Sequence, residues 1–236
     1  MKKNIALVVL FFATTFFTTK SITIEKVQAN VETKQLEKGK SVTLKSHIFY
    51  QSNGDCVTHY SSPVEYFVIT NKLGEVKIYD PIQNTVLVQQ DNIYSSKTTP
   101  FYFFLSGKSN DMGLADYGFA PVKTYAEKYY LVSEWKMKKT SNGIPVQSVK
   151  LVHQQQTPTY MEYKGEKNKI LRKVFYYKYT KLNQFDFPTT VTDIVYNLKA
   201  KDSVITRTTY SDIKLNADAN SNYFNYKVPV TAKKIN

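Results

Sequence analysis

The strongest constraint on the fold of this chain is a succession of short segments in which apolar and polar residues alternate with a period of two. Between Ser41 and Gln90 these segments are rich in Val, Ile, Tyr, Phe and Thr, and turn residues such as Ser52-Asn53-Gly54-Asp55 separate them. Successive side chains of a strand point to opposite faces of a sheet, so the pattern predicts strands with one buried face. Tight turns between such strands favour antiparallel pairing.

About eleven strands are expected along the chain. They are predicted at Val42–Gln51, Cys56–Ser61, Glu65–Asn71, Val76–Tyr79, Thr85–Gln90, Tyr129–Lys138, Val146–His153, Thr159–Tyr163, Ile170–Tyr179, Thr189–Leu198 and Ser203–Ile213. The alternation stops between Ser95 and Glu127, where an aromatic cluster follows Pro100 and precedes Gly107. Proline is tolerated in the first turn of a helix and glycine favours its C-terminal cap, so a short helix is predicted there. Sandwich, closed barrel and curved half-barrel all fit this pattern.

The N-terminus has the pattern of a secretory signal peptide. A basic start, Met1–Asn4, precedes an apolar or small run from Ile5 to Phe17, which is shorter than the roughly 20 residues needed to cross a membrane. Val27-Gln28-Ala29 places small or short residues where a signal peptidase reads them, so residues 1–29 are expected to be removed. One exported domain, residues 30–236, is then expected in the periplasm.

Cys56 is the only cysteine, which excludes an intramolecular disulfide and leaves no cysteine beside the leader to carry a lipid anchor. Loss of residues 1–29, with four lysines and one glutamate, lowers the net charge from +13 to +10. This charge suits acidic partners or an anionic membrane surface, and a solvated lysine-rich face explains it equally well. No basic helix or aromatic RNA-binding motif is present, so no nucleic-acid partner is expected.

Catalytic and metal-binding motifs are not evident. His47, His59 and His153 lack a second ligand at metal-binding spacing, although His47 and His59 could meet across the first hairpin. The sequence has no phosphate-binding loop, nucleophile elbow or dinucleotide fingerprint. Its carboxylates show no obvious pair of the kind a glycosidase requires. Neither an enzyme nor a cofactor is predicted.

The chain contains 19 tyrosines and 14 phenylalanines, which indicates a large apolar interior. A filled sandwich core explains them, and so does the lining of a ligand cavity. The order of the segments, a meander, an aromatic insert and a second meander, favours a curved sheet whose mouth is covered by an apolar lid.

Several short motifs resemble those of the outer-membrane lipoprotein carrier (LolA-like) family. They are Phe49-Tyr50-Gln51, Ser52-Asn53-Gly54-Asp55, Ser62-Pro63, Tyr66-Phe67, Ile78-Tyr79-Asp80-Pro81 and Phe224-Asn225-Tyr226-Lys227-Val228-Pro229. The resemblance covers roughly residues 42–90 and 185–230. One position departs from the family pattern: Ser62 stands where the family has an arginine that holds the lid closed.

The resemblance implies a half-open antiparallel β-barrel of about eleven strands, with a helical lid over an apolar cavity. It also implies a monomeric periplasmic carrier that receives lipoprotein acyl chains from an inner-membrane donor complex and passes them to an outer-membrane acceptor. The residues expected to contact lipid are Leu44, Ile48, Tyr66, Val68, Ile78, Val88, Phe101, Phe103, Phe104, Leu105, Trp135 and Met137.

Three other functions remain open on sequence alone. The same fold could carry another envelope lipid or apolar metabolite. The chain could instead be a structural or adhesive β-sandwich, or a hydrolase that uses scattered carboxylates.

Overall fold

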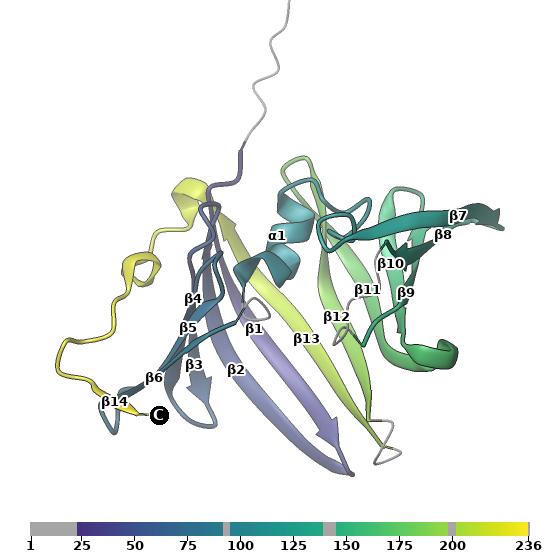
Figure 1. The fold of residues 1–236 in the computed structure, drawn as a ribbon. Helices are drawn as coiled ribbons and strands as arrows, with labels where there is room; N and C mark the ends of the chain where they lie inside the picture. Colours follow the sequence, from purple (N-terminus) through teal and green to yellow (C-terminus); the bar gives the residue numbers. More distant parts are fainter. Residues whose placement is uncertain (1–22, 92–94, 139–144, 198–201, 236) are drawn as a thin grey trace, which may run out of the picture.

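The computed structural model describes residues 23–91, 95–138, 145–197 and 202–235. These residues form one 14-stranded sheet with a single α-helix, α1 (Pro100–Leu105), on its inner side (Figure 1). The strands are β1 (Lys26–Glu37), β2 (Lys40–Gln51), β3 (Cys56–Ser62), β4 (Tyr66–Thr70), β5 (Glu75–Asp80), β6 (Thr85–Gln90), β7 (Phe119–Glu127), β8 (Tyr130–Met137), β9 (Ser148–Gln154), β10 (Thr157–Lys164), β11 (Ile170–Leu182), β12 (Phe185–Asn197), β13 (Asp202–Leu215) and β14 (Lys233–Ile235).

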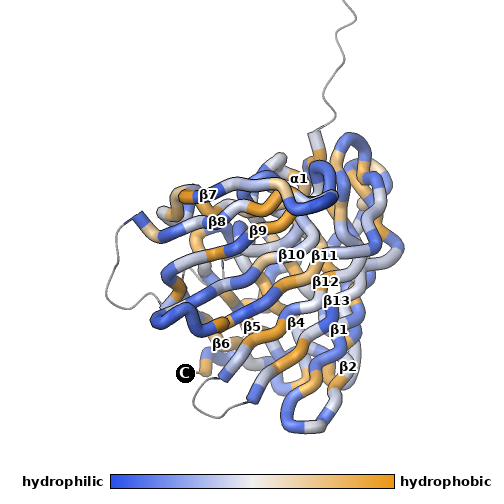
Figure 2. The backbone as a smooth tube through the Cα atoms, turned by 90° about the vertical axis from the view of Figure 1, so that its right-hand side faces the viewer, coloured by the Kyte–Doolittle hydropathy of each residue, from blue (hydrophilic) through white to orange (hydrophobic). Residues whose placement is uncertain are grey.

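The sheet is open, curved and almost entirely antiparallel. Its order is β14-β6-β5-β4-β3-β2-β1-β13-β12-β11-β10-β9-β8-β7, and only the short β14 pairs parallel, with β6. The strand β1 pairs with both β2 and β13, so it joins the two meanders into one surface. The predicted half-open barrel is therefore confirmed, and the apolar and polar colours alternate along its strands (Figure 2).

The two faces of the sheet bury separate apolar clusters. The concave cluster lies beneath α1 and contains Val27, Tyr50, Phe101 and Phe187. The convex cluster forms where the chain after β13 crosses the back of β2 to β6, and Phe224 packs there. Residues next to each other on one strand, such as Phe49 and Tyr50, thus serve different clusters, as a period of two requires.

Three strands were not predicted from the sequence. The strand β1 overlaps the expected leader, β14 has three residues, and β7 lies within the stretch from Ser95 to Glu127, which lacks clear alternation in the sequence. Pro121 obscured the pattern of β7, because proline is rare inside sheets. Here β7 is an edge strand, and its pairing with β8 shifts register between Pro121 and Lys123.

The predicted cleavage position lies inside β1. Val27 and Ala29 have no exposed surface, and they pair with Tyr50 and Ile48 of β2. Cleavage after Ala29 would remove both side chains from the concave cluster. We therefore propose that the leader is cut upstream of Lys26.

A comparison of two N-terminal truncations tests this proposal. A protein that begins at Thr23 should unfold at a higher temperature than one that begins at Asn30, because the shorter form loses the burial of Val27 and Ala29. Each fully buried valine contributes roughly 1.5–3 kcal/mol. Thermal unfolding by circular dichroism measures the difference, and equal midpoints would contradict the proposal.

Candidate functional site

The helix α1 is specified by local sequence signals. Thr99 caps it by accepting a hydrogen bond from the Tyr102 amide, Pro100 occupies the first turn, and Gly107 follows the end with φ +71°. The turn before α1 is fixed to the first meander, since the Ser96 hydroxyl donates to the Gly54 carbonyl at 2.6 Å. The predicted helix is thus confirmed.

Two of the four aromatic residues on α1, Phe101 and Phe104, fill the centre of the concave face. The Phe101 ring stacks on Phe187 at 5.0 Å between centroids and also lies 6.0 Å from Tyr50. Phe104 meets Tyr176 edge to face at 5.5 Å. Both phenylalanines are almost completely buried. This part of the insert is therefore a core that joins the two meanders.

The segment 106–118, which follows α1, covers the neighbouring part of the concave face. Asp111 folds it into a turn by accepting hydrogen bonds from the amides of Gly113 and Ala115. The turn buries Met112 and Leu114 against the concave cluster. Gly113 has φ +75°, and a Cβ there would lie 2.7 Å from the Phe103 ring, so this contact requires glycine.

His153 of β9 anchors the same segment. The side chain is buried, and its Nε2 lies 3.1 Å from the Ser109 carbonyl, which makes Nε2–H the donor. Burial lowers the pKa of His153, and the hydrogen bond to the carbonyl offsets this in part. Burial therefore favours the neutral imidazole in the folded state, with Nε2–H donating to segment 106–118.

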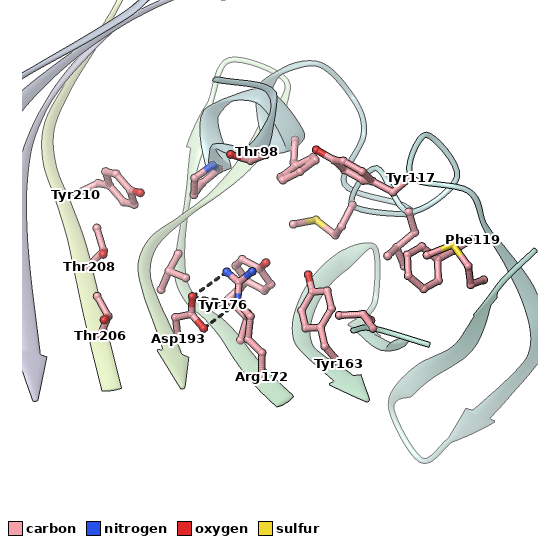
Figure 3. Close-up of a pocket in the computed structure, with 18 residues that line it drawn as sticks. Thr98, Tyr117, Phe119, Tyr163, Arg172, Tyr176, Asp193, Thr206, Thr208 and Tyr210 are labelled. Atoms are coloured by element: carbon pink, nitrogen blue, oxygen red, sulfur yellow. Dashed lines mark hydrogen bonds and ion pairs between the residues drawn. The ribbon is translucent and has the colours of Figure 1, made fainter. Parts of the chain in front are cut away.

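A cavity of about 470 Å³ lies on the concave face, between segment 106–118 and the strands β10 to β13 (Figure 3). Its apolar side is formed by α1, segment 106–118 and the nearest strands. The apolar lining includes Phe103, Met112, Leu114, Phe119, Met137, Val146, Val174 and Val191. Its other side is polar and comes from β10 to β13: Tyr163, Arg172, Tyr176, Asp193, Thr206, Thr208 and Tyr210.

An ion pair lies on the polar side of this cavity. Arg172 Nε donates to Asp193 Oδ1 at 2.9 Å, and Nη2 donates to Oδ2 at 2.7 Å. The two residues are near neighbours on the paired strands β11 and β12, where Asp193 is opposite Val174. Burial lowers the pKa of Arg172, but the hydrogen bonds to Asp193 and its negative charge raise the pKa by more than burial lowers it. The pKa of Arg172 therefore lies above its usual value.

Two tyrosines, Tyr163 and Tyr176, lie beside the ion pair. The hydroxyls of Tyr163 and Tyr176 each lie 3.6 Å from the sulfur of Met161, a weak acceptor. Burial raises the pKa of both tyrosines, so both are neutral donors at physiological pH. The Arg172 guanidinium lies over the Tyr163 ring at 5.3 Å.

The structure brings only part of the predicted lipid-contact set to this cavity. Phe103 and Met137 line it together. Phe101, Phe104 and Leu105 belong to the concave core, against which Ile48 and Trp135 also pack. Four others are on the concave face beyond the cavity lining: Leu44, Tyr66, Val68 and Ile78. Lipid contact by these residues stays a prediction.

The predicted position of Val88 on the concave face is wrong. Ile78 pairs with Leu87, whereas Val88 pairs with Lys77, so Val88 points to the convex side and is 40% exposed. The predicted bounds of this strand, Thr85–Gln90, agree with β6. A shift of one residue in register, however, moves a side chain from one face of the sheet to the other.

The polar side of the cavity was not predicted. One signal was present in the sequence: Arg172 is one of two arginines in the chain, and it alternates in phase with Val174 and Tyr176. Asp193 is likewise in phase with Val191. Charged residues on an otherwise apolar face of a strand indicate a paired or functional position.

Other candidate sites have structural explanations. His47 and His59 do pair across β2 and β3, but the described residues hold no group of three potential metal ligands. His59 instead stacks on Phe67 and contacts Glu65 at 2.9 Å. Burial raises the pKa of Cys56 to about 12, which agrees with its predicted role as a small buried residue.

Solved structures with the same architecture are found at low sequence identity. A LolA superfamily protein from Nitrosomonas europaea aligns with a TM-score of 0.56 and 13% identity, over 83% of this chain and 88% of the other. A putative outer membrane lipoprotein-sorting protein domain from Vibrio parahaemolyticus gives 0.56 and 16%, over 85% and 89%. The chain has the LolA-like fold.

A DUF1329 family protein from Desulfovibrio piger has this LolA-like architecture as well, with a TM-score of 0.60 and 11% identity over 86% of this chain and 90% of the other. No protein-family model matches the sequence, and no curated protein sequence does. The similarity is therefore one of fold. Among the helices that the structure describes, none has the length and apolar character needed to cross a membrane.

The buried His153 predicts a pH dependence of stability. Because its pKa is lower in the folded state than the ordinary 6.5, its neutral form stabilises the fold above that pH. Stability should fall as the pH drops through 6.5 towards the lower folded-state pKa. His153→Gln keeps an N–H donor that does not titrate, so the thermal midpoint of this variant should change less between pH 7.5 and 5.5. Equal changes in both proteins would contradict the assignment.

Proposed function

We propose that this protein is a periplasmic carrier that shields lipoprotein acyl chains in its concave cavity and transfers them towards the outer membrane. The observation that carries the proposal is the covered cavity, whose apolar side is built from α1, segment 106–118 and the adjoining strands. A LolA-like fold and the pattern of an N-terminal leader support the same function.

Burial of a chain in this cavity is favourable because it removes apolar surface from water. Each buried methylene contributes about 0.8 kcal/mol of favourable free energy. Insertion of part of an acyl chain can therefore offset the free energy lost when a few covering side chains are displaced. Phe103 is well placed to respond, because it is only half-buried and lines the cavity, whereas Phe101 on the same helix is locked in the core.

Transfer would then require that the affinity for the acyl chain increase from the donor to the carrier and from the carrier to the acceptor. The donor is expected to be an inner-membrane complex and the acceptor an outer-membrane protein, and the carrier is expected to be monomeric. Ser62 pairs with Lys45 of β2, whereas His153 holds segment 106–118 and Ser96 holds the turn before α1. Control of the lid would therefore differ from the arginine lock of the family.

A second candidate is a carrier of another envelope lipid or apolar metabolite. The cavity volume favours it, since about 470 Å³ is typical of a site for one small ligand. Mass spectrometry of material extracted from the purified protein would separate the two, because the first candidate requires acylated peptide and the second requires a free lipid.

The remaining alternatives find less support. A structural or adhesive sandwich would fill its interior, yet the concave face retains a cavity. A glycosidase needs two facing carboxylates, and Asp193 is the only one among the residues that line the cavity. We therefore infer a binding function without catalysis.

Replacement of Phe103 tests the proposed cavity. Phe103→Asp places a charge in the apolar lining and should weaken binding of the neutral fluorophore N-phenylnaphthylamine by about tenfold or more. Fluorescence titration measures the change, and circular dichroism should show an intact sheet.

Ile82→Asp is the matched control for Phe103→Asp. Ile82 lies in the turn between β5 and β6 and is 77% exposed, so this variant should bind the fluorophore like the unchanged protein. Unchanged binding by Phe103→Asp would contradict the proposed cavity. An equal loss of fluorophore binding in Phe103→Asp and Ile82→Asp would show that the loss does not come from the cavity lining.

A further inference from the structure

Several hydrogen-bond donors on the polar side of the cavity have no oxygen acceptor among the described residues. Arg172 directs Nε and Nη2 to Asp193, and its other terminal nitrogen, Nη1, has no hydrogen-bond partner among the described residues. Among the residues that the structure describes, the hydroxyls of Tyr163 and Tyr176 have only the thioether of Met161 as a hydrogen-bond partner. Such donors are satisfied best by oxygen acceptors on a ligand.

Two further residues contribute hydroxyl groups to this wall. Tyr210 of β13 points into the cavity, and its hydroxyl has no hydrogen-bond partner in the described part of the chain (Figure 3). The hydroxyl of Thr208, two residues before it, has one hydrogen-bond partner within the described ranges, the Thr33 hydroxyl at 3.5 Å. The donors come from β10, β11 and β13, and Asp193 lies on β12 between them, so four consecutive strands of the sheet form one wall.

The charges on this wall cancel. A ligand anion near Arg172 would also lie near Asp193, whose carboxylate is bound to the guanidinium at 2.7 Å. Attraction by one charge would be offset by repulsion from the other. The wall therefore favours an uncharged oxygen acceptor, and the free lone pairs of Asp193 can accept from a ligand hydroxyl.

The pair is accessible from the cavity. The Arg172 side chain is 46% exposed and that of Asp193 is 26% exposed, although both lie on the concave face beside buried Val174 and Tyr176. The apolar lining begins directly beside them, at Val191 and Val174. An amphipathic molecule can thus place its chain under segment 106–118 and its polar linkage against the ion pair.

We propose that this wall recognises the uncharged ester linkage of an acylglycerol, with the ester carbonyl accepting from Arg172 and the tyrosines and a ligand hydroxyl donating to Asp193. This inference rests on the proposed function, because it assigns a ligand class to the same cavity. It goes beyond that function in stating that the polar linkage, and not the chain alone, is selected.

Competition between matched lipids tests the proposal. N-phenylnaphthylamine is bound first, and monopalmitoylglycerol, its hexadecyl ether analogue and palmitate then displace it. The ester should displace the fluorophore at concentrations about tenfold lower than the ether, which corresponds to about 1.4 kcal/mol for the lost carbonyl acceptor. Palmitate should also be the weaker competitor above the pKa of its carboxyl group.

The variant Arg172→Met/Asp193→Leu should remove this preference. Both charges are replaced together, since loss of one alone would leave the other unpaired. The ester and the ether should then compete equally, while the fluorophore itself still binds. Arg207→Met is the matched control, because Arg207 is the other arginine of the chain and lies one residue out of phase with Thr206 and Thr208, on the opposite face of β13.

Tyr176→Phe provides a second, milder variant in case the double replacement fails to fold. It removes one donor without changing charge, so the preference for the ester should decrease while binding of the fluorophore is retained. An unchanged preference in both variants would overturn the role of this wall.

The outcomes separate this inference from the proposed function. If the fluorophore binds and the ester and ether displace it equally, the ester assignment fails while the carrier function stands. Tighter binding of palmitate would replace the ester with an anion and also overturn the proposal. If the fluorophore does not bind at all, the carrier function fails and the ligand assignment fails with it.

Discussion

The pairing of β1 with β13 is the interaction on which the rest of the structure depends. It joins a meander built from residues 40–90 to one built from residues 119–215, and each alone would be an open sheet with an exposed apolar face. Once joined, the two meanders present a continuous concave surface, and α1 packs at its centre. Phe101 shows this directly, because its ring contacts Tyr50 from one meander and Phe187 from the other.

The concave surface is divided into a filled part and a hollow part. Phe101 and Phe104 fill the centre, where large rings from both meanders meet. Beyond them, β11 to β13 present threonines, an aspartate and an arginine in place of large apolar side chains, and segment 106–118 covers these without filling the space. The hollow thus arises from a local change in composition on strands whose geometry is otherwise regular.

The sequence predicted the architecture well because alternation, turns and helix caps are local signals. Pro100 and Gly107 marked the helix correctly, and the eleven expected strands are all present. The rest depended on information that is not local. The face of Val88 is decided by its pairing with Lys77, and β1 was hidden by a leader-like motif. Asp193 seemed isolated in sequence because its partner is on another strand.

The seam between β1 and β13 also determines when the fold can be completed. The backbone amide of Glu25, just before β1, is bound by Asn216, which is 191 residues later in the chain. Hairpins within each meander need only neighbouring residues, but the seam needs two strands that are distant in sequence, and long-range pairing of this kind is slow to form. The concave surface is therefore expected to assemble after the hairpins of each meander.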